Sequence, residues 1–195
     1  MNKLKIASLI LLLSGIFFLI GCKKDTHDDQ NNENQVVTPI DTTTTKPDEP
    51  KDPNAPVNPE TEKINKTRLL ELVNAVRAEG CDCGVNGYFA PANPVKWNDT
   101  LELAAGDHCL DMFNNDFFEH TGSDKSSPGD RIKRRGYAWS TYGENIAKGY
   151  KSEEAVIQGW LNSDGHCKNI MNPSFKEMGI AKVGSYWAQV FGVRK

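Results

Sequence analysis

From residue 63 onward the sequence lacks an excess of charge of either sign. This stretch carries 17 basic and 16 acidic residues, and the whole chain of 195 residues has a formal net charge of −3. Domains that bind nucleic acids generally present a basic patch or stripe, and attraction to an anionic surface likewise needs positive charge. The balance of charge therefore argues against a nucleic-acid partner.

The sequence also lacks an apolar run of the length that a membrane-spanning helix needs. Two lysines precede an uncharged run from Ile6 to Ile20, which is shorter than the roughly 20 residues of a spanning helix and is typical of a secretory signal peptide. The run ends in Leu19-Ile20-Gly21-Cys22, which resembles the lipobox of bacterial lipoproteins. We therefore expect residues 1–21 to be a lipoprotein signal peptide and Cys22 to carry the lipid. An ordinary signal peptide with an accidental cysteine is the alternative.

Aromatic residues and glycines are missing from Lys23 to Glu62. This segment holds six of the ten prolines, and its four lysines are outnumbered by ten acidic residues. Such a composition cannot bury enough apolar surface to offset the entropy lost on folding. We expect residues 22–62 to be a disordered, acidic and proline-rich tether, lipidated at its first residue, with one domain over residues 63–195.

The lysines that follow Cys22 suggest a destination. Lys23-Lys24-Asp25 is similar to the short signal that sends some lipoproteins to the outer face of the outer membrane. We expect an exported lipoprotein of the cell envelope that is held in the outer membrane through Cys22 and exposed at the surface.

The cysteines lack the two closely spaced pairs that structural zinc sites commonly use. Apart from Cys22 they are Cys81, Cys83, Cys109 and Cys167, and an even set in an exported chain indicates two disulfides with three possible connectivities. A bond between Cys81 and Cys83 would be strained because one residue separates them. We predict that one of these two pairs with Cys109 and the other with Cys167.

Apolar periodicity and turn residues predict helices that alternate with strands. Apolar residues from Ile64 to Val76 recur at helical spacing, with Asn65 or Thr67 as the cap and Gly80 as the end. Further helices are expected from Asp99 or Thr100 to Asn114, from Ser127-Pro128 to Gly136, from Glu153 to Leu161, and from Ser163 through His166. The basic run from Arg131 to Arg135 is interpreted as a solvated helix face, with a binding patch as the alternative.

Alternating residues predict strands in the second half of the chain. Residues 142–147 alternate polar with apolar side chains, and residues 178–183 and 186–191 alternate around Gly184-Ser185, which predicts a hairpin. The segment from Cys81 to Pro94 is rich in glycine and proline and is expected to be a loop. We expect an α+β fold with three or more strands flanked by helices on both sides.

Three residues have the chemistry of a site. His120, Glu144 and His166 form a divalent-metal set or a general acid–base set if they converge. No fixed spacing connects them, so spacing alone does not select them. The chain also lacks a nucleophile elbow and an HExxH helix.

Several blocks in order resemble the CAP superfamily, the SCP-like domain of cysteine-rich secretory proteins, antigen 5 and pathogenesis-related proteins, in its compact bacterial form. The blocks are His120-Thr-Gly-Ser-Asp, Ser127-Pro-Gly-Asp-Arg131, Gly136-Tyr137, Gly143-Glu-Asn-Ile-Ala147, Trp160 with Ser163-Asp-Gly-His166, Asn169-Ile-Met171 and Tyr186-Trp-Ala-Gln-Val-Phe-Gly192. The resemblance implies an α-β-α sandwich, with a central mixed or antiparallel sheet between helical layers and a large open cleft.

The resemblance also implies a metal site of two histidines and two glutamates that binds zinc or magnesium. His120, Glu144 and His166 match the first three members. Eukaryotic members place the second glutamate three residues after the tryptophan, where this chain has Ser163. Glu153 or Glu154, which precede Trp160 in the sequence, is the alternative fourth member. A site of three ligands would bind metal more weakly or would leave a position for water.

Two functions from different classes fit these residues. We favour an envelope-anchored binding module, not an enzyme, whose cleft takes a lipid, a glycan or a protein, because the family resembles binding proteins more than enzymes with a shared reaction. The alternative is a divalent-metal-dependent hydrolase or protease that uses His120, Glu144 and His166. Cys167 is a poor nucleophile candidate, since neighbouring residues of a helix point about 100° apart and a bond to His166 is disfavoured.

Overall fold

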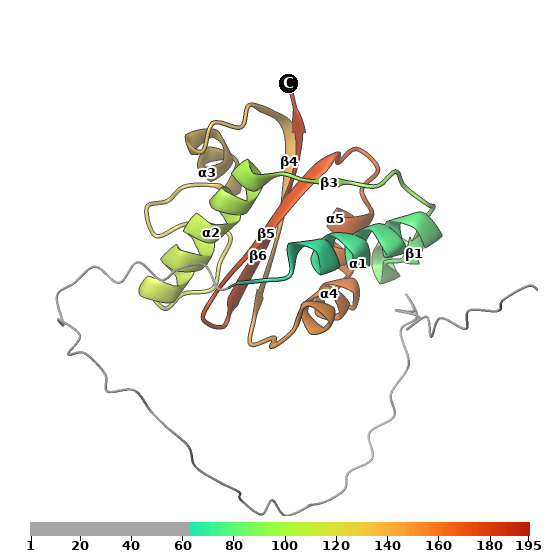
Figure 1. Ribbon diagram of the computed structural model, residues 1–195, viewed down its shortest axis with the longest axis horizontal. Helices are drawn as coiled ribbons and strands as arrows, with labels where there is room; N and C mark the ends of the chain where they lie inside the picture. Colours follow the sequence, from blue (N-terminus) through green and yellow to red (C-terminus); the bar gives the residue numbers. More distant parts are fainter. Residues whose placement is uncertain (1–62) are drawn as a thin grey trace, which may run out of the picture.

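A four-stranded sheet separates two layers of helices in the computed structural model, which describes residues 63–195 (Figure 1). The strands lie in the order β3 (Lys96–Trp97), β5 (Glu177–Val183), β6 (Tyr186–Arg194) and β4 (Trp139–Lys148). β3 is parallel to β5, whereas β5 and β4 are both antiparallel to β6. This mixed sheet between helical layers is the predicted α-β-α sandwich.

Helices α1 (Lys66–Glu79), α4 (Glu153–Leu161) and α5 (Asp164–Met171) cover one face of the sheet, and α2 (Asp99–Asn114) and α3 (Pro128–Arg134) cover the other (Figure 1). Successive side chains of β6 point to opposite faces of the sheet. Trp187 and Phe191 pack with the first group of helices, while Ala188 and Val190 pack with the second. The sheet thus divides two apolar clusters.

The helix boundaries follow local signals. Asn65 caps α1 by accepting from the backbone N–H of Arg68, and Gly80 ends the helix. Ser127 caps α3 in a capping box with Asp130. The cap of α2 is Asn98, whose side chain accepts from two backbone N–H groups, and not Asp99 or Thr100 as predicted.

The segment after α1 is more regular than the predicted loop. β1 (Cys81–Asp82) and β2 (Tyr88–Phe89) form a small antiparallel pair around the short 3-10 helix η1 (Gly84–Asn86). A disulfide between Cys83 and Cys167, whose Cα atoms are 5.4 Å apart, joins this segment to α5. The predicted link between this segment and Cys167 is therefore confirmed for Cys83.

The predicted disulfide to Cys109 is wrong. Cys109 is a free, fully buried thiol of α2 whose Sγ lies 3.4 Å from the carbonyl oxygen of Ala181. Cys81, Cys83 and Cys167 all belong to the apolar cluster on the opposite face of the sheet. The sheet therefore stands between Cys109 and its expected partners.

The predicted signal peptide (1–21), the tether (22–62) and the lipidation site Cys22 lie outside the described residues. Within residues 63–195, no helix combines the length and the apolar character needed to cross a membrane.

Candidate functional site

Glu144 lies on β4, the strand at one end of the sheet, and its side chain is only 2% exposed. Nη2 of Arg131, in α3, donates to Oε2 of Glu144 at 2.7 Å, and the Arg131 side chain is 3% exposed. A charge removed from water is tolerated when an opposite charge and hydrogen bonds compensate it. Arg131 supplies both to Glu144.

Arg131 also fixes the loop that carries His120. Its guanidinium donates to the carbonyl oxygens of Ser126 at 3.1 Å and of His120 at 3.0 Å. Arg131 thus contradicts the interpretation of a solvated basic face, whereas Arg134 and Arg135, with side chains 57% and 40% exposed, agree with it. One basic residue of the run faces inward because the helix turns it toward β4.

His120 and Arg131 both form hydrogen bonds with the carboxylate of Glu144. Nδ1 of His120 lies 2.8 Å from Oε1 of Glu144, and the His120 side chain is half exposed. An ionised carboxylate only accepts hydrogen bonds, so Nδ1 carries the proton. Nε2 is then the ring nitrogen that His120 presents to a ligand.

His166 lies in the first turn of α5, as predicted. Burial, followed by the nearby charge of His120, lowers the pKa of His166. The lowered pKa keeps this imidazole neutral at pH 7. His120 lies in the loop between α2 and α3, whereas His166 lies on α5, on the other side of the sheet.

Side-chain amides connect α5 to β4 beside the site. Asn169 donates to the carbonyl oxygen of Glu144 at 3.1 Å and to the side chain of Asn145 at 2.8 Å. Asn145 in turn donates to the side chain of Gln189 at 2.9 Å and to the carbonyl oxygen of His166 at 3.2 Å. This network sets the position of His166 relative to Glu144.

Sequence reasoning assigned no role to the amide network. Asn145 and Gln189 are fully buried and are paired across β4 and β6. Gln189 lies in phase with Trp187 and Phe191, which face the core. A polar residue at an inward-facing strand position was the available signal.

His108 was also missed as part of the site. This fully buried residue of α2 hydrogen-bonds through Nε2 to the carbonyl oxygen of Glu119 at 2.8 Å, and the same nitrogen lies 3.8 Å from Oε1 of Glu144. Burial is the main cause that lowers the pKa of His108. The sequence showed only a histidine within an apolar helix.

Glu144, one of the three predicted metal ligands, is already held by other side chains of the chain. Both oxygens of Glu144 are engaged, one by the cationic Arg131 and one by His120. In residues 63–195, one group of three potential metal ligands has its ligand atoms within 4.8 Å of one another. This group is Cys81, Cys83 and Cys167, and two of its members form the disulfide. Ser163 stands at the N-cap position of α5. Metal binding by His120, Glu144 and His166 stays a prediction.

Comparison with known proteins places this chain in a described family. The family profile of cysteine-rich secretory proteins, CAP, matches residues 70–191. The uncharacterized protein YkwD of Bacillus subtilis is 37% identical over 126 residues, which are 64% of this chain and 45% of that protein. The chain thus spans less than half the length of this relative.

Solved structures share the fold. An extracellular protein with an SCP domain from Bacillus anthracis superimposes with a TM-score of 0.57 at 30% identity, over 66% of this chain and 40% of that one. An outer surface protein of Borrelia burgdorferi gives a TM-score of 0.53 at 24% identity, over 69% of this chain and 99% of that one. At that identity the second likeness concerns the fold alone.

Proposed function

The chain belongs to the cysteine-rich secretory protein (CAP) family, and we propose that it is an exported binding module whose ligand contacts His120 and His166. One observation carries this proposal: Glu144 is buried and both of its oxygens are bound by its own chain. A carboxylate held in this way orients an imidazole, and it is a poor nucleophile or general base. The half-exposed ring of His120 is then the group that meets the ligand.

The ligand class follows from these two imidazoles. Nε2 of His120 and the neutral ring of His166 offer hydrogen bonds to a polar group. A lipid head group, a glycan or a protein side chain supplies such a group. The chain's own described residues leave the His120 ring half exposed, which gives the ligand access.

We extend the proposal to location. The signal-like run that ends at Cys22 supports attachment of the chain to the cell envelope through a lipid on that cysteine. The similar Bacillus anthracis protein is described as extracellular, which supports export. Metabolic labelling with a radioactive fatty acid, followed by membrane fractionation, tests the anchor. Label and membrane association should both be lost in Cys22→Ser and kept in Cys109→Ser; retention of both in Cys22→Ser contradicts the anchor.

A mass-spectrometric inventory of molecules that copurify with the full chain tests the binding function. A bound species should be present with the unaltered chain and depleted with His120→Ala. Gln158→Ala, a change at a half-buried position of α4, is the matched control and should retain the species. An empty site across lipid, glycan and peptide panels, or equal retention by both variants, contradicts the proposal.

The alternative function, a divalent-metal-dependent hydrolase, is favoured by one observation. The lowered pKa of His166 keeps its ring neutral, which is the state that binds a metal ion. A metal that binds the folded chain raises its melting temperature. A zinc-dependent rise that His166→Ala abolishes would support this alternative, together with turnover of a peptide or glycan pool that Glu144→Ala abolishes. Without the rise, the alternative fails.

A further inference from the structure

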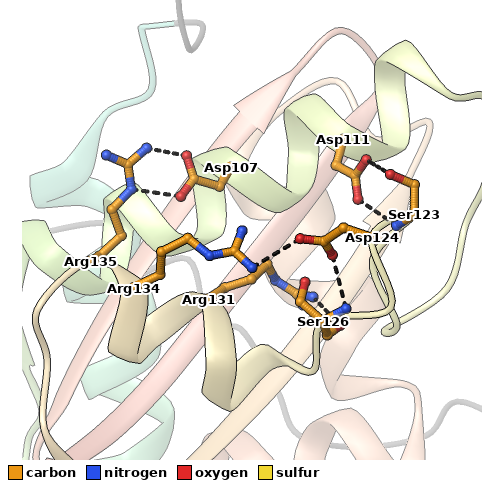
Figure 2. A pocket seen from close by; sticks show the side chains of 8 residues that line it. All are labelled: Asp107, Asp111, Ser123, Asp124, Ser126, Arg131, Arg134 and Arg135. Atoms are coloured by element: carbon orange, nitrogen blue, oxygen red, sulfur yellow. Dashed lines mark hydrogen bonds and ion pairs between the residues drawn. The ribbon is translucent and has the colours of Figure 1, made fainter.

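A second polar site has a lining that does not include His120. A pocket of about 430 Å³ opens between α2, α3 and the loop that joins them (Figure 2). This volume falls within the range of about 300–1,000 Å³ found for small-molecule sites. The lining residues are Asp107, Asp111, Ser123, Asp124, Ser126, Arg131, Arg134 and Arg135.

The lining excludes several ligand classes. All of its side chains are charged or carry a hydroxyl group, so an acyl chain would meet polar groups on every side. Three carboxylates are interleaved with three guanidinium groups. Either an anion or a cation would therefore meet like charges beside its partners. A neutral, strongly hydrogen-bonding ligand fits this lining best.

The carboxylates are already held in place. Asp124 accepts from the backbone N–H of Ser126 at 2.9 Å and from Nη2 of Arg134 at 2.9 Å (Figure 2). Asp111 accepts from the hydroxyl of Ser123 at 2.6 Å and from its backbone N–H at 2.8 Å. Because these contacts exist without a ligand, binding requires little further ordering of the carboxylates.

The pocket has both hydrogen-bond donors and hydrogen-bond acceptors that can bind a ligand. Arg134 donates to Asp124 through Nη2, whereas a guanidinium carries five N–H groups in all. Carboxylate oxygens accept more than one hydrogen bond each. A sugar hydroxyl donates and accepts at once, so neighbouring hydroxyls of one ring match adjacent carboxylates and guanidinium groups.

The innermost guanidinium belongs to Arg131, which is fixed from behind by Glu144. Nε of Arg131 has no hydrogen-bond partner among the described residues. The pocket thus combines a rigid inner end with a rim of exposed pairs such as Arg134 and Asp124, whose side chains are 57% and 51% exposed.

We propose that this pocket, which we call the α2–α3 pocket, binds a mono- or disaccharide unit of a glycan. The proposal does not rest on the binding function assigned to His120 and His166. It adds a recognition site for a neutral polyhydroxylated ligand, with Asp124 and Arg134 at its rim.

NMR titration of the full chain with maltose and with N,N′-diacetylchitobiose tests the proposal. At least one sugar should shift the backbone amide signals of Ser123 and Ser126 in a saturable manner. Arg134→Ala and Asp124→Ala should each weaken that affinity by about tenfold or more, the loss expected for a hydrogen bond to a charged group. Inorganic phosphate and octanoate, titrated separately, should leave these amides unshifted.

The matched control is Arg68→Ala. Arg68 and Glu154 form an exposed pair at 2.8 Å, with side chains 41% and 50% exposed, on the opposite face of the sheet. This variant should bind sugar like the unaltered chain. No amide shift with either sugar up to its solubility limit, a stronger shift with phosphate, or equal loss in Arg68→Ala would overturn the proposal. A sugar that shifts only the ring signals of His120 would overturn it while leaving the binding function of His120 intact.

Discussion

At the scale of single residues, Arg131 compensates a carboxylate that has almost no access to water. Replacing it by Met should destabilise the fold by about 3 to 5 kcal/mol, because Glu144 would remain buried without its cation. Urea unfolding monitored by circular dichroism measures the change. Arg134→Met, on the exposed side of the same helix, should leave the midpoint nearly unchanged. Equal midpoints for both variants would show that Arg131 does not compensate Glu144.

The buried His108 makes stability depend on pH. Burial lowers its pKa in the folded chain, whereas the unfolded chain protonates it near its ordinary value of about 6.5. Below pH 6.5 the unfolded state therefore binds more protons, and stability falls as the pH drops toward the lowered folded-state pKa. The slope contributed by His108 is at most about 1.4 kcal/mol per pH unit.

Urea unfolding of the unaltered chain and of His108→Gln between pH 7.5 and 5 tests this dependence. Gln keeps a donor for the carbonyl oxygen of Glu119 but does not titrate. The variant should show a smaller loss of stability on acidification than the unaltered chain. His166, whose pKa is also lowered, remains in both proteins and contributes equally. Parallel stability curves would refute a role for His108.

Prediction from the sequence is weakest for polar residues whose contacts come from distant segments of the chain. His120 and Glu144 were identifiable only through the family resemblance, because no spacing rule connects a loop to an edge strand. Arg131 was misjudged because a run of basic residues has the same composition whether one member faces inward or none does. Its burial depends on the carboxylate of Glu144, which is contributed by strand β4.

At the scale of elements, α2 packs onto β5 at a glycine. A Cβ atom added at Gly179 would lie 2.1 Å from the backbone nitrogen of Glu102, and backbone cannot move aside as a side chain end does. Gly179→Ala should therefore separate α2 from the sheet and destabilise the fold by about 1 to 3 kcal/mol or more.

Gly165→Ala is the matched control for Gly179→Ala. Gly165 lies inside α5, and an added Cβ would meet nothing within 4 Å. Because Ala is the better helix former, this change should stabilise the fold by roughly 0.5 to 1 kcal/mol. Thermal unfolding by calorimetry compares the two variants. A Gly179→Ala protein as stable as Gly165→Ala would contradict the close packing of α2 on β5.

Elements with local signals were predicted well. Ser127-Pro128 and Gly184-Ser185 mark a helix start and a hairpin turn through the conformations of those residues, and the structure has both. β3 was missed because its two residues have no periodicity and pair with Glu177 and Met178, far along the chain. A disulfide was wrongly predicted for Cys109, because the spacing of cysteines in the sequence does not show on which face of the sheet each thiol lies.

At the scale of the whole molecule, the sheet makes one cooperative unit of two apolar clusters. Leu69 of α1 and Leu101 of α2 are fully buried on opposite faces. β5 and β6 supply side chains to both clusters, with Ile180 and Ala181 as neighbours that point to different sides. Loss of either helical layer would leave one face of the same strands exposed, so neither layer should persist alone.

Leu69→Ala and Leu101→Ala form a matched pair that tests this cooperativity. Each should destabilise the chain by about 2 to 5 kcal/mol through lost burial and a cavity. Because unfolding couples both faces, circular dichroism and tryptophan fluorescence should report one coincident transition in each variant. The double variant should lose roughly the sum of the two effects, since the side chains share no contact cluster. Separate transitions in either single variant would show that the two layers unfold independently, which would make the sheet a boundary between two units.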